Sequence, residues 1–71
     1  MDIVINGIYK HYKGKKYKVI AIGKHSETEE EMVIDQALYG ENNIWCRPRN
    51  MWNDNIELNG KYVRRFELIK D

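Results

Sequence analysis

The stretch from Met32 to Pro48 most constrains what this chain can fold into, because it holds two apolar runs joined by a polar turn. The first run is rich in β-prone residues, and the Gly-Glu-Asn-Asn sequence that follows it is typical of a turn. The pattern therefore predicts a β-hairpin. Its two arms carry apolar side chains that we expect to seed a small core: Val33, Ile34, Ala37, Leu38, Tyr39, Ile44, Trp45 and Cys46.

A second hairpin is predicted ahead of this one. Residues 7–12 alternate loosely between apolar or aromatic and polar side chains, which suits a strand. A short turn around Gly14 leads to a more buried strand over residues 17–22. The polar, acidic segment 25–31 has no periodicity and predicts a loop with one turn of helix at most.

The C-terminal third predicts a break and then a third hairpin. Pro48 lacks an amide donor, so a strand should stop there, and a short 3₁₀-type turn should tuck Met51 or Trp52 under the sheet. Asn59-Gly60 is the strongest type I′ turn signal in the chain. We expect residues 61–69 to return as one strand that places four side chains on one face: Tyr62, Arg64, Phe66 and Leu68.

Five to six short strands without helical periodicity predict an all-β fold, a small SH3-like, partly open barrel of antiparallel strands. An OB-like barrel is the alternative, although it usually needs more chain. With 71 residues, positions 1–71 make a single domain. One cysteine excludes an internal disulfide, and neither a signal peptide nor an apolar run of about 18 residues is present, so we expect a cytoplasmic protein without membrane contact.

Five motifs in order carry a resemblance to a known family: Gly7-x-Tyr9-x-His11-Tyr12-Lys13-Gly14, Tyr17-x-Val19, His25-Ser26-Glu27-Thr28, Gln36-Ala37-Leu38-Tyr39-Gly40 and Trp45-x-Arg47-Pro48. The chain resembles the bacterial domain-of-unknown-function family numbered sixteen fifty-three, from about Gly7 to about Phe66. This resemblance implies an SH3-like barrel of cytoplasmic bacterial origin and implies no activity. Asp35 and Cys46 depart from the tyrosine-like or hydrophobic residue and the valine expected at those positions.

Polar and aromatic residues of the motifs suggest a ligand-binding groove. If the arms of the central hairpin are neighbours and the two histidines end adjacent strands, these side chains would line one surface for a peptide, a protein or a small ligand. Against this, Trp45 and Tyr39 would also serve as core residues with hydrogen-bonded polar ends. The groove hypothesis names Tyr9, His11, His25, Glu27, Gln36, Tyr39, Trp45 and Arg47.

The alternative hypothesis is nucleic-acid binding by the first hairpin, whose lysines alternate with aromatic residues. The net charge of +1 and the pI near 7.8 argue against it, because strongly binding domains usually have a pI above about 9. The alternative without a binding function is that these lysines only keep an exposed hairpin soluble. They are Lys10, Lys13, Lys15, Lys16 and Lys18.

Catalytic and metal chemistry have little support in the sequence. Cys46 with His11 or His25 would supply a nucleophile and a base, but nothing in the pattern brings them together. A lone cysteine is more often a small buried apolar residue, and these three residues lack metal-ligand spacing. We therefore expect no catalytic residues, no metal and no cofactor, and a protein that is a monomer or, through an unpaired edge strand, a weak dimer.

Overall fold

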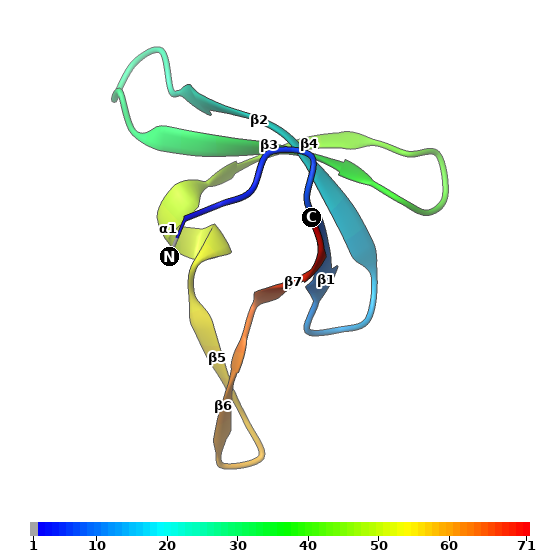
Figure 1. Ribbon diagram of the computed structural model, residues 1–71. Coiled ribbons are helices and arrows are strands. Elements are labelled where there is room, and N and C mark those ends of the chain that lie inside the picture. The colour runs from blue at the N-terminus through cyan, green and yellow to red at the C-terminus, as the bar shows by residue number, and fades with distance from the viewer. Residues whose placement is uncertain (1) are drawn as a thin grey trace.

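The computed structural model describes residues 2–71, which form a curved five-stranded antiparallel sheet and a separate two-stranded hairpin (Figure 1). The sheet has the order β4-β3-β2-β1-β7. It contains β1 (Ile8–His11), β2 (Lys16–Lys24), β3 (Glu31–Ala37), β4 (Ile44–Pro48) and β7 (Phe66–Lys70). The helical turn α1 (Arg49–Trp52) follows β4, and β5 (Asn55–Leu58) pairs with β6 (Lys61–Arg64). The prediction of an all-β, antiparallel, partly open architecture is confirmed.

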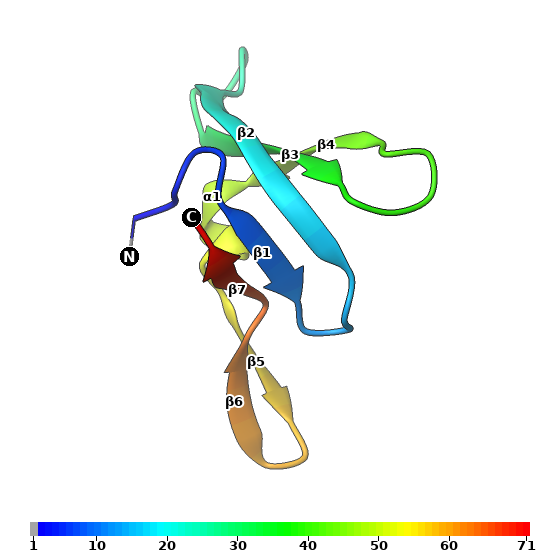
Figure 2. The ribbon, with the colours of Figure 1, turned by 45° about the vertical axis from the view of Figure 1, so that its right-hand side comes forward.

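The long strand β2 gives the sheet its curvature (Figure 2). Its pairing with β3 shifts between Val19 and Ala21, so that Ile20 is an extra, bulged residue. A second shift interrupts the pairing of β1 with β7. Because a bulge bends a strand and increases its local twist, these two irregularities curl the sheet toward a barrel without closing it.

The core lies on the inner face of this curved sheet. Trp52 stacks on Phe66 with ring centroids 3.8 Å apart, and Tyr9 packs edge-on against Trp52 at 5.2 Å. The other buried apolar side chains are Ile3, Tyr17, Val19, Met32, Val33 and Ala37. The predicted turn after Pro48 is present, as one turn of α-helix and not of 3₁₀-helix, and it carries Trp52 into the core.

Two expectations about packing were wrong. The second arm of the central hairpin contributes little to the core, since Ile44, Trp45 and Cys46 are exposed. The reason is that β4 is an edge strand, with a neighbour on one side only. Residues 61–69 also do not form one strand with a common face, because the run breaks at Arg65 and its halves join different sheets.

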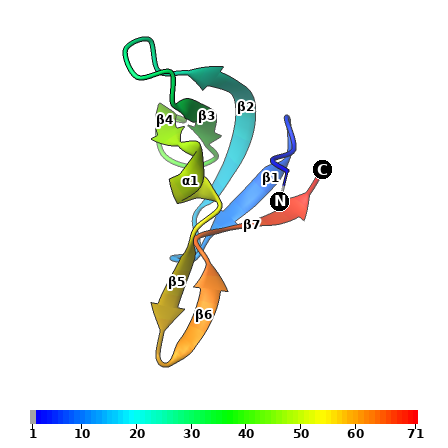
Figure 3. The ribbon, with the colours of Figure 1, turned by 90° about the vertical axis from the view of Figure 1, so that its left-hand side faces the viewer.

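The hairpin β5–β6 projects from the rest of the molecule, as Figure 3 shows. Its turn is the predicted one: Asn59 and Gly60 have φ of 53° and 80°, the paired positive values of a type I′ turn. Within the described part of the chain, no helix is long and apolar enough to cross a membrane.

Candidate functional site

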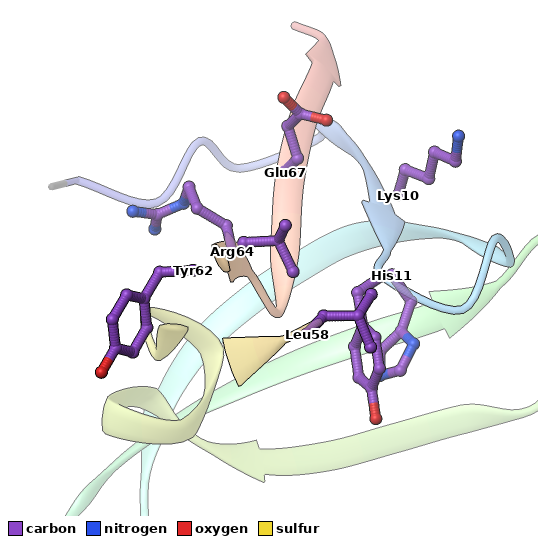
Figure 4. Close-up of a pocket in the computed structure, with 8 residues that line it drawn as sticks. Lys10, His11, Leu58, Tyr62, Arg64 and Glu67 are labelled. Atoms are coloured by element: carbon purple, nitrogen blue, oxygen red, sulfur yellow. The ribbon is translucent and has the colours of Figure 1, made fainter. Parts of the chain in front are cut away.

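A cleft of about 450 Å³ opens between the end of β1, the start of β7 and the projecting hairpin (Figure 4). We call it the hairpin cleft. A concave site of this size suits a small molecule or a peptide side chain. It is lined by Lys10, His11, Tyr12, Leu58, Tyr62, Val63, Arg64 and Glu67.

Backbone and side-chain contacts at Arg65 hold the base of the hairpin against the end of β1. The Tyr12 N–H donates to the Arg65 carbonyl at 2.9 Å, and the Arg65 N–H donates to the Asp54 carbonyl at 3.0 Å. The Arg65 guanidinium also forms an ion pair with the Asp54 carboxylate at 3.2 Å. These contacts redirect the chain from β6 into β7, and they bring together cleft walls that are far apart in the sequence.

The hairpin contributes an open apolar wall. Ile56 is paired with Val63 and Leu58 with Lys61, so Leu58 and Val63 share one face of the two-stranded ladder. Leu58 is 45% exposed and Val63 is 36% exposed. A two-stranded hairpin has no second layer to cover such a face, so this apolar surface remains available to a ligand.

His11 lies where the cleft meets the core. Its ring packs on Tyr12 with centroids 4.5 Å apart and edge-on against Phe66 at 5.0 Å. Its Nδ1 accepts the Lys13 N–H at 3.2 Å. Burial, assisted by the positive charges of Arg47, Arg65 and Lys13, lowers the pKa of His11 below 6.5. At neutral pH the ring is therefore uncharged, with its proton on Nε2 as a hydrogen-bond donor.

The charged groups of the cleft are mostly cationic. Lys10 forms no ion pair among residues 2–71, although Glu67 is directly opposite it in the β1–β7 pairing. The Arg64 guanidinium already makes two hydrogen bonds, which it donates to the Phe66 carbonyl and to Asn53 Oδ1, both at 3.3 Å. Glu67 supplies the single carboxylate of the lining. The lining therefore favours a ligand that combines an apolar body with an anionic group.

A second cluster, which we call the arginine cluster, lies on the inner face toward β4. Arg47 Nε donates to Asp35 Oδ1 at 3.0 Å, and the Asp35 side chain is completely buried. The guanidinium lies 4.9 Å from the ring centroid of Tyr17 and 5.7 Å from that of Trp45, both within cation–π range. Tyr17 and Tyr39 share a hydrogen bond of 2.7 Å between their hydroxyl groups.

Burial raises the pKa of Asp35, and the Arg47 hydrogen bond and charge only partly oppose this. Oδ2 of the same carboxylate has no hydrogen-bond partner in the described part of the chain. The cluster nevertheless leaves two aromatic side chains open to solvent, since Trp45 is 46% exposed and Tyr39 is 37% exposed. The alternative in which both residues merely fill the core is therefore wrong.

The eight residues of the groove hypothesis do not form one surface. Tyr39, Trp45 and Arg47 belong to the arginine cluster, and His11 adjoins it through an edge contact with Tyr17 at 6.3 Å. Tyr9 is a core residue whose hydroxyl accepts the Val4 N–H.

The other members of that hypothesis lie apart. His25 and Glu27 are in the β2–β3 turn, where His25 Nδ1 accepts the Glu27 N–H at 3.1 Å. Gln36 alternates with the inward-facing residues of β3, and its amide donates to the Asn42 carbonyl. His25 thus has a local structural role at a turn, with no ligand needed to explain it.

The five lysines of the first hairpin divide into two groups. Lys10 is directly opposite Lys16 in the β1–β2 pairing, and Lys18 follows two residues later, so these three share the outer face. Lys13 and Lys15 are at the turn, and their ammonium groups lie 5.8 Å and 4.7 Å from the ring centroids of Tyr12 and Tyr39.

Cys46 does not meet either histidine. It alternates along β4 with Trp45 and Arg47, which face inward, whereas His11 is on the inner side of β1. Within residues 2–71, no group of three or more His, Cys, Asp or Glu side chains is arranged to hold a metal ion.

Sequence reasoning missed the hairpin half of the cleft. The available signal was the apolar residues Leu58, Tyr62 and Val63 on both sides of Asn59-Gly60, in a hairpin that is too short to bury them. The prediction of a single strand over residues 61–69 hid this signal, because such a strand would place Tyr62 in the main sheet.

The comparisons with known proteins agree on one family. The model of the family described as "Protein of unknown function (DUF1653)" matches residues 7–68. A crystal structure of a DUF1653 protein from Bordetella bronchiseptica is similar in fold, with a TM-score of 0.84 and 26% identity, covering 94% of this chain and 88% of that chain. No curated protein matches the chain.

Proposed function

The chain belongs to the DUF1653 family, whose description names no activity, and we propose that it is a binding module whose ligand site is the hairpin cleft. The observation that carries this proposal is that one cleft is lined by the open apolar wall of Leu58 and Val63, by His11 and by a lysine that forms no ion pair among the described residues. The ligand is a small molecule or a peptide side chain with an apolar body and an anionic group. The body packs against the wall, and the anion pairs with Lys10.

The architecture supports a binding role more than a chemical one. The described residues place neither a nucleophile beside a base nor a metal-ligand cluster. The curled, partly open antiparallel sheet with a helical turn before its last strands supports the proposal of an SH3-like barrel, a fold that commonly acts as a recognition module. The proposal also keeps the expectation from the sequence that this is a non-enzymatic module of the cytoplasm.

The test uses 8-anilinonaphthalene-1-sulfonate, a probe that joins an aromatic body to a sulfonate. Titrated into ¹⁵N-labelled protein, it should shift amide resonances of residues 10–12, 58–64 and 67. Lys10→Gln should weaken binding roughly fivefold, the equivalent of about 1 kcal/mol for a partly exposed charge pair. Lys16→Gln is the matched control, because Lys16 is directly opposite Lys10 but does not line the cleft.

A second pair of variants tests the apolar wall. Val63→Thr keeps the side-chain shape but places a hydroxyl in the wall, so probe affinity should fall, whereas Ile44→Thr makes the same kind of change on β4 and should leave affinity unchanged. Shifts that cluster on β4, or equal losses in the two lysine variants, would contradict the proposal.

Nucleic-acid binding remains the second candidate, because Lys10, Lys16 and Lys18 share the outer face. A short single-stranded oligonucleotide of mixed sequence should then shift these residues at low salt, and the shifts should vanish at moderate salt as counterions compete. No shifts at either salt concentration would remove this candidate and leave the cleft as the ligand site.

A further inference from the structure

The outer edge of β4 presents unpaired backbone groups. β4 is the terminal strand of the sheet, and the described chain places no strand on its other side. The Ala37 N–H donates to the Asn43 carbonyl at 2.9 Å, so residue 43 directs its backbone groups toward β3. In an antiparallel ladder this direction alternates. Trp45 and Arg47 therefore also bond toward β3, while Ile44, Cys46 and Pro48 point away from it.

The position of the proline agrees with this assignment. Pro48 is paired with Met32 in register, yet it has no N–H to donate. An N–H at this position would point toward the free edge, so the β3–β4 ladder loses no hydrogen bond. This is the side on which an edge strand tolerates proline. Residues 2–71 supply no strand to pair with the N–H and carbonyl groups of Cys46 and Ile44 on that edge.

The side chains of this edge are unusually apolar for an exposed strand. Ile44 is 55% exposed, Trp45 is 46% exposed and Cys46 is exposed. Proteins commonly protect free edges with lysine, with inward-pointing charge or with a covering loop, because an unprotected edge is a template for another strand. β4 carries Pro48 at its end and one inward-pointing charge, Arg47. Its outward-pointing side chains, Ile44 and Cys46, are uncharged and exposed.

We propose that β4 pairs antiparallel with β4 of a second copy of this chain, about a twofold axis that passes beside Cys46. The pairing is self-complementary, as a twofold interface requires. On the inner face, Trp45 lies opposite Arg47 of the second copy, an aromatic ring beside a cation. On the outer face, Ile44 lies opposite Pro48 of the second copy, and the two Cys46 residues meet and exchange backbone hydrogen bonds.

This arrangement closes, whereas a pairing of β4 with β7 between copies does not. Pairing of β4 with the edge strand β7 of another copy would be head-to-tail, and each copy would keep one free edge for the next. In the β4–β4 dimer, the hairpin clefts lie at the β1–β7 side of each sheet, opposite the shared edge. The dimer therefore presents two clefts, and its existence does not depend on what they bind.

The first experiment measures association by sedimentation velocity over a range of protein concentrations. The unchanged protein should show a monomer–dimer equilibrium. Cys46→Pro removes the N–H that points outward and spares the β3–β4 ladder, so the dimer dissociation constant should rise roughly tenfold or more. Cys46→Ser keeps that N–H and should dimerise like the unchanged protein.

The second experiment locates the axis. A short bismaleimide should join two Cys46 thiols into a covalent dimer, and denaturant should prevent this. If Cys46→Pro fails to fold, Ile44→Lys replaces it. Ile44 is already more than half exposed, so the fold should tolerate a lysine there. In the dimer this lysine would be opposite the apolar Pro48 of the second copy, so it should weaken the pairing. A protein that is monomeric at every concentration, a dimer that persists in the folded blocking variant, or open-ended oligomers would overturn the proposal.

Discussion

His11 connects the folding free energy of this protein to pH. Its folded-state pKa is lowered, chiefly by burial, so below 6.5 the unfolded chain binds a proton more readily than the folded chain. The contribution of His11 to stability is therefore complete above 6.5 and is lost as the pH falls below it. The urea midpoint of the unchanged protein should decline between about pH 7 and about pH 5.

His11→Asn should remove that decline. The asparagine oxygen can still accept the Lys13 N–H two residues ahead, so the turn is kept while the titrating group is lost. His25→Asn is the matched control, since His25 accepts the Glu27 N–H in the same way and the substitution leaves His11 in place. An unchanged slope in His11→Asn would show that another group causes the acid sensitivity.

Arg47 is the partner on which the buried Asp35 carboxylate depends. Arg47→Met should cost about 3–5 kcal/mol of unfolding free energy at neutral pH, because it leaves a buried charge without compensation. Since burial raises the folded pKa of Asp35, protonation relieves that cost, and the deficit should shrink as the pH is lowered from about 7 toward about 4.

Two comparisons make the Arg47 prediction specific. The double variant Asp35→Leu/Arg47→Met removes both charges and should recover most of the loss in urea denaturation. Arg49→Met removes an exposed ion pair with Glu31 of the same 3.0 Å length and should cost about 1 kcal/mol or less. Equal losses from Arg47→Met and Arg49→Met would mean that burial of Asp35 is not the cause.

Among the elements, hairpin β5–β6 depends most on its turn. Gly60 has a φ of +80°, and an alanine there would be strained by about 1–2 kcal/mol. An isolated two-stranded hairpin is only marginally stable, so this strain should unfold β5–β6 locally. Gly60→Ala should therefore weaken amide protection in residues 55–64 and leave β2 and β3 protected.

Gly23→Ala provides the comparison within another strand. Gly23 has no atom within 4 Å of an added Cβ and no positive φ. This substitution should be neutral or stabilise the protein by up to about 1 kcal/mol, because it restricts the unfolded chain. If Gly60→Ala retained full hairpin protection, the type I′ turn would not be what maintains β5–β6.

The local sequence pattern was enough to predict those elements whose conformation depends on their own residues. The polar turn after Tyr39, Pro48 and Asn59-Gly60 mark hairpins and ends, and each was found in the structure. The pattern failed where an element depends on hydrogen bonds to residues that are distant in the sequence. Arg65 breaks the last run because its backbone bonds to Tyr12 and Asp54, and nothing in residues 61–69 records those contacts.

The same distinction explains the candidate site. The sequence analysis named Trp45, Tyr39 and Arg47, but the exposure of Trp45 follows from the edge position of β4, which is a property of the whole sheet. The hairpin cleft combines residues 10–12 with residues 58–67. Only the tertiary path through Arg65 brings these segments together, so composition and periodicity could not reveal the cleft.

At the scale of the whole molecule, one stacked ring pair bridges the two edges of the open sheet. Trp52 is in the turn directly after the edge strand β4, and Phe66 begins the other edge strand, β7. Their stacking, with planes 5° apart, connects the ends that a closed barrel would join by strand pairing. The five-stranded sheet thus has its own anchor, while β5–β6 shares no ladder with it.

This division predicts two levels of dynamics. In native-state hydrogen exchange, amides of β5 and β6 should exchange much faster than those of β2 and β3, because the hairpin has no second layer and can open without unfolding the sheet. Saturating 8-anilinonaphthalene-1-sulfonate should slow exchange in β5 and β6 by contacting Leu58 and Val63, with little change in β2. Uniform protection in the free protein would contradict independent opening. Slowing spread evenly over all strands would show that the probe stabilises the whole fold and does not act through the hairpin.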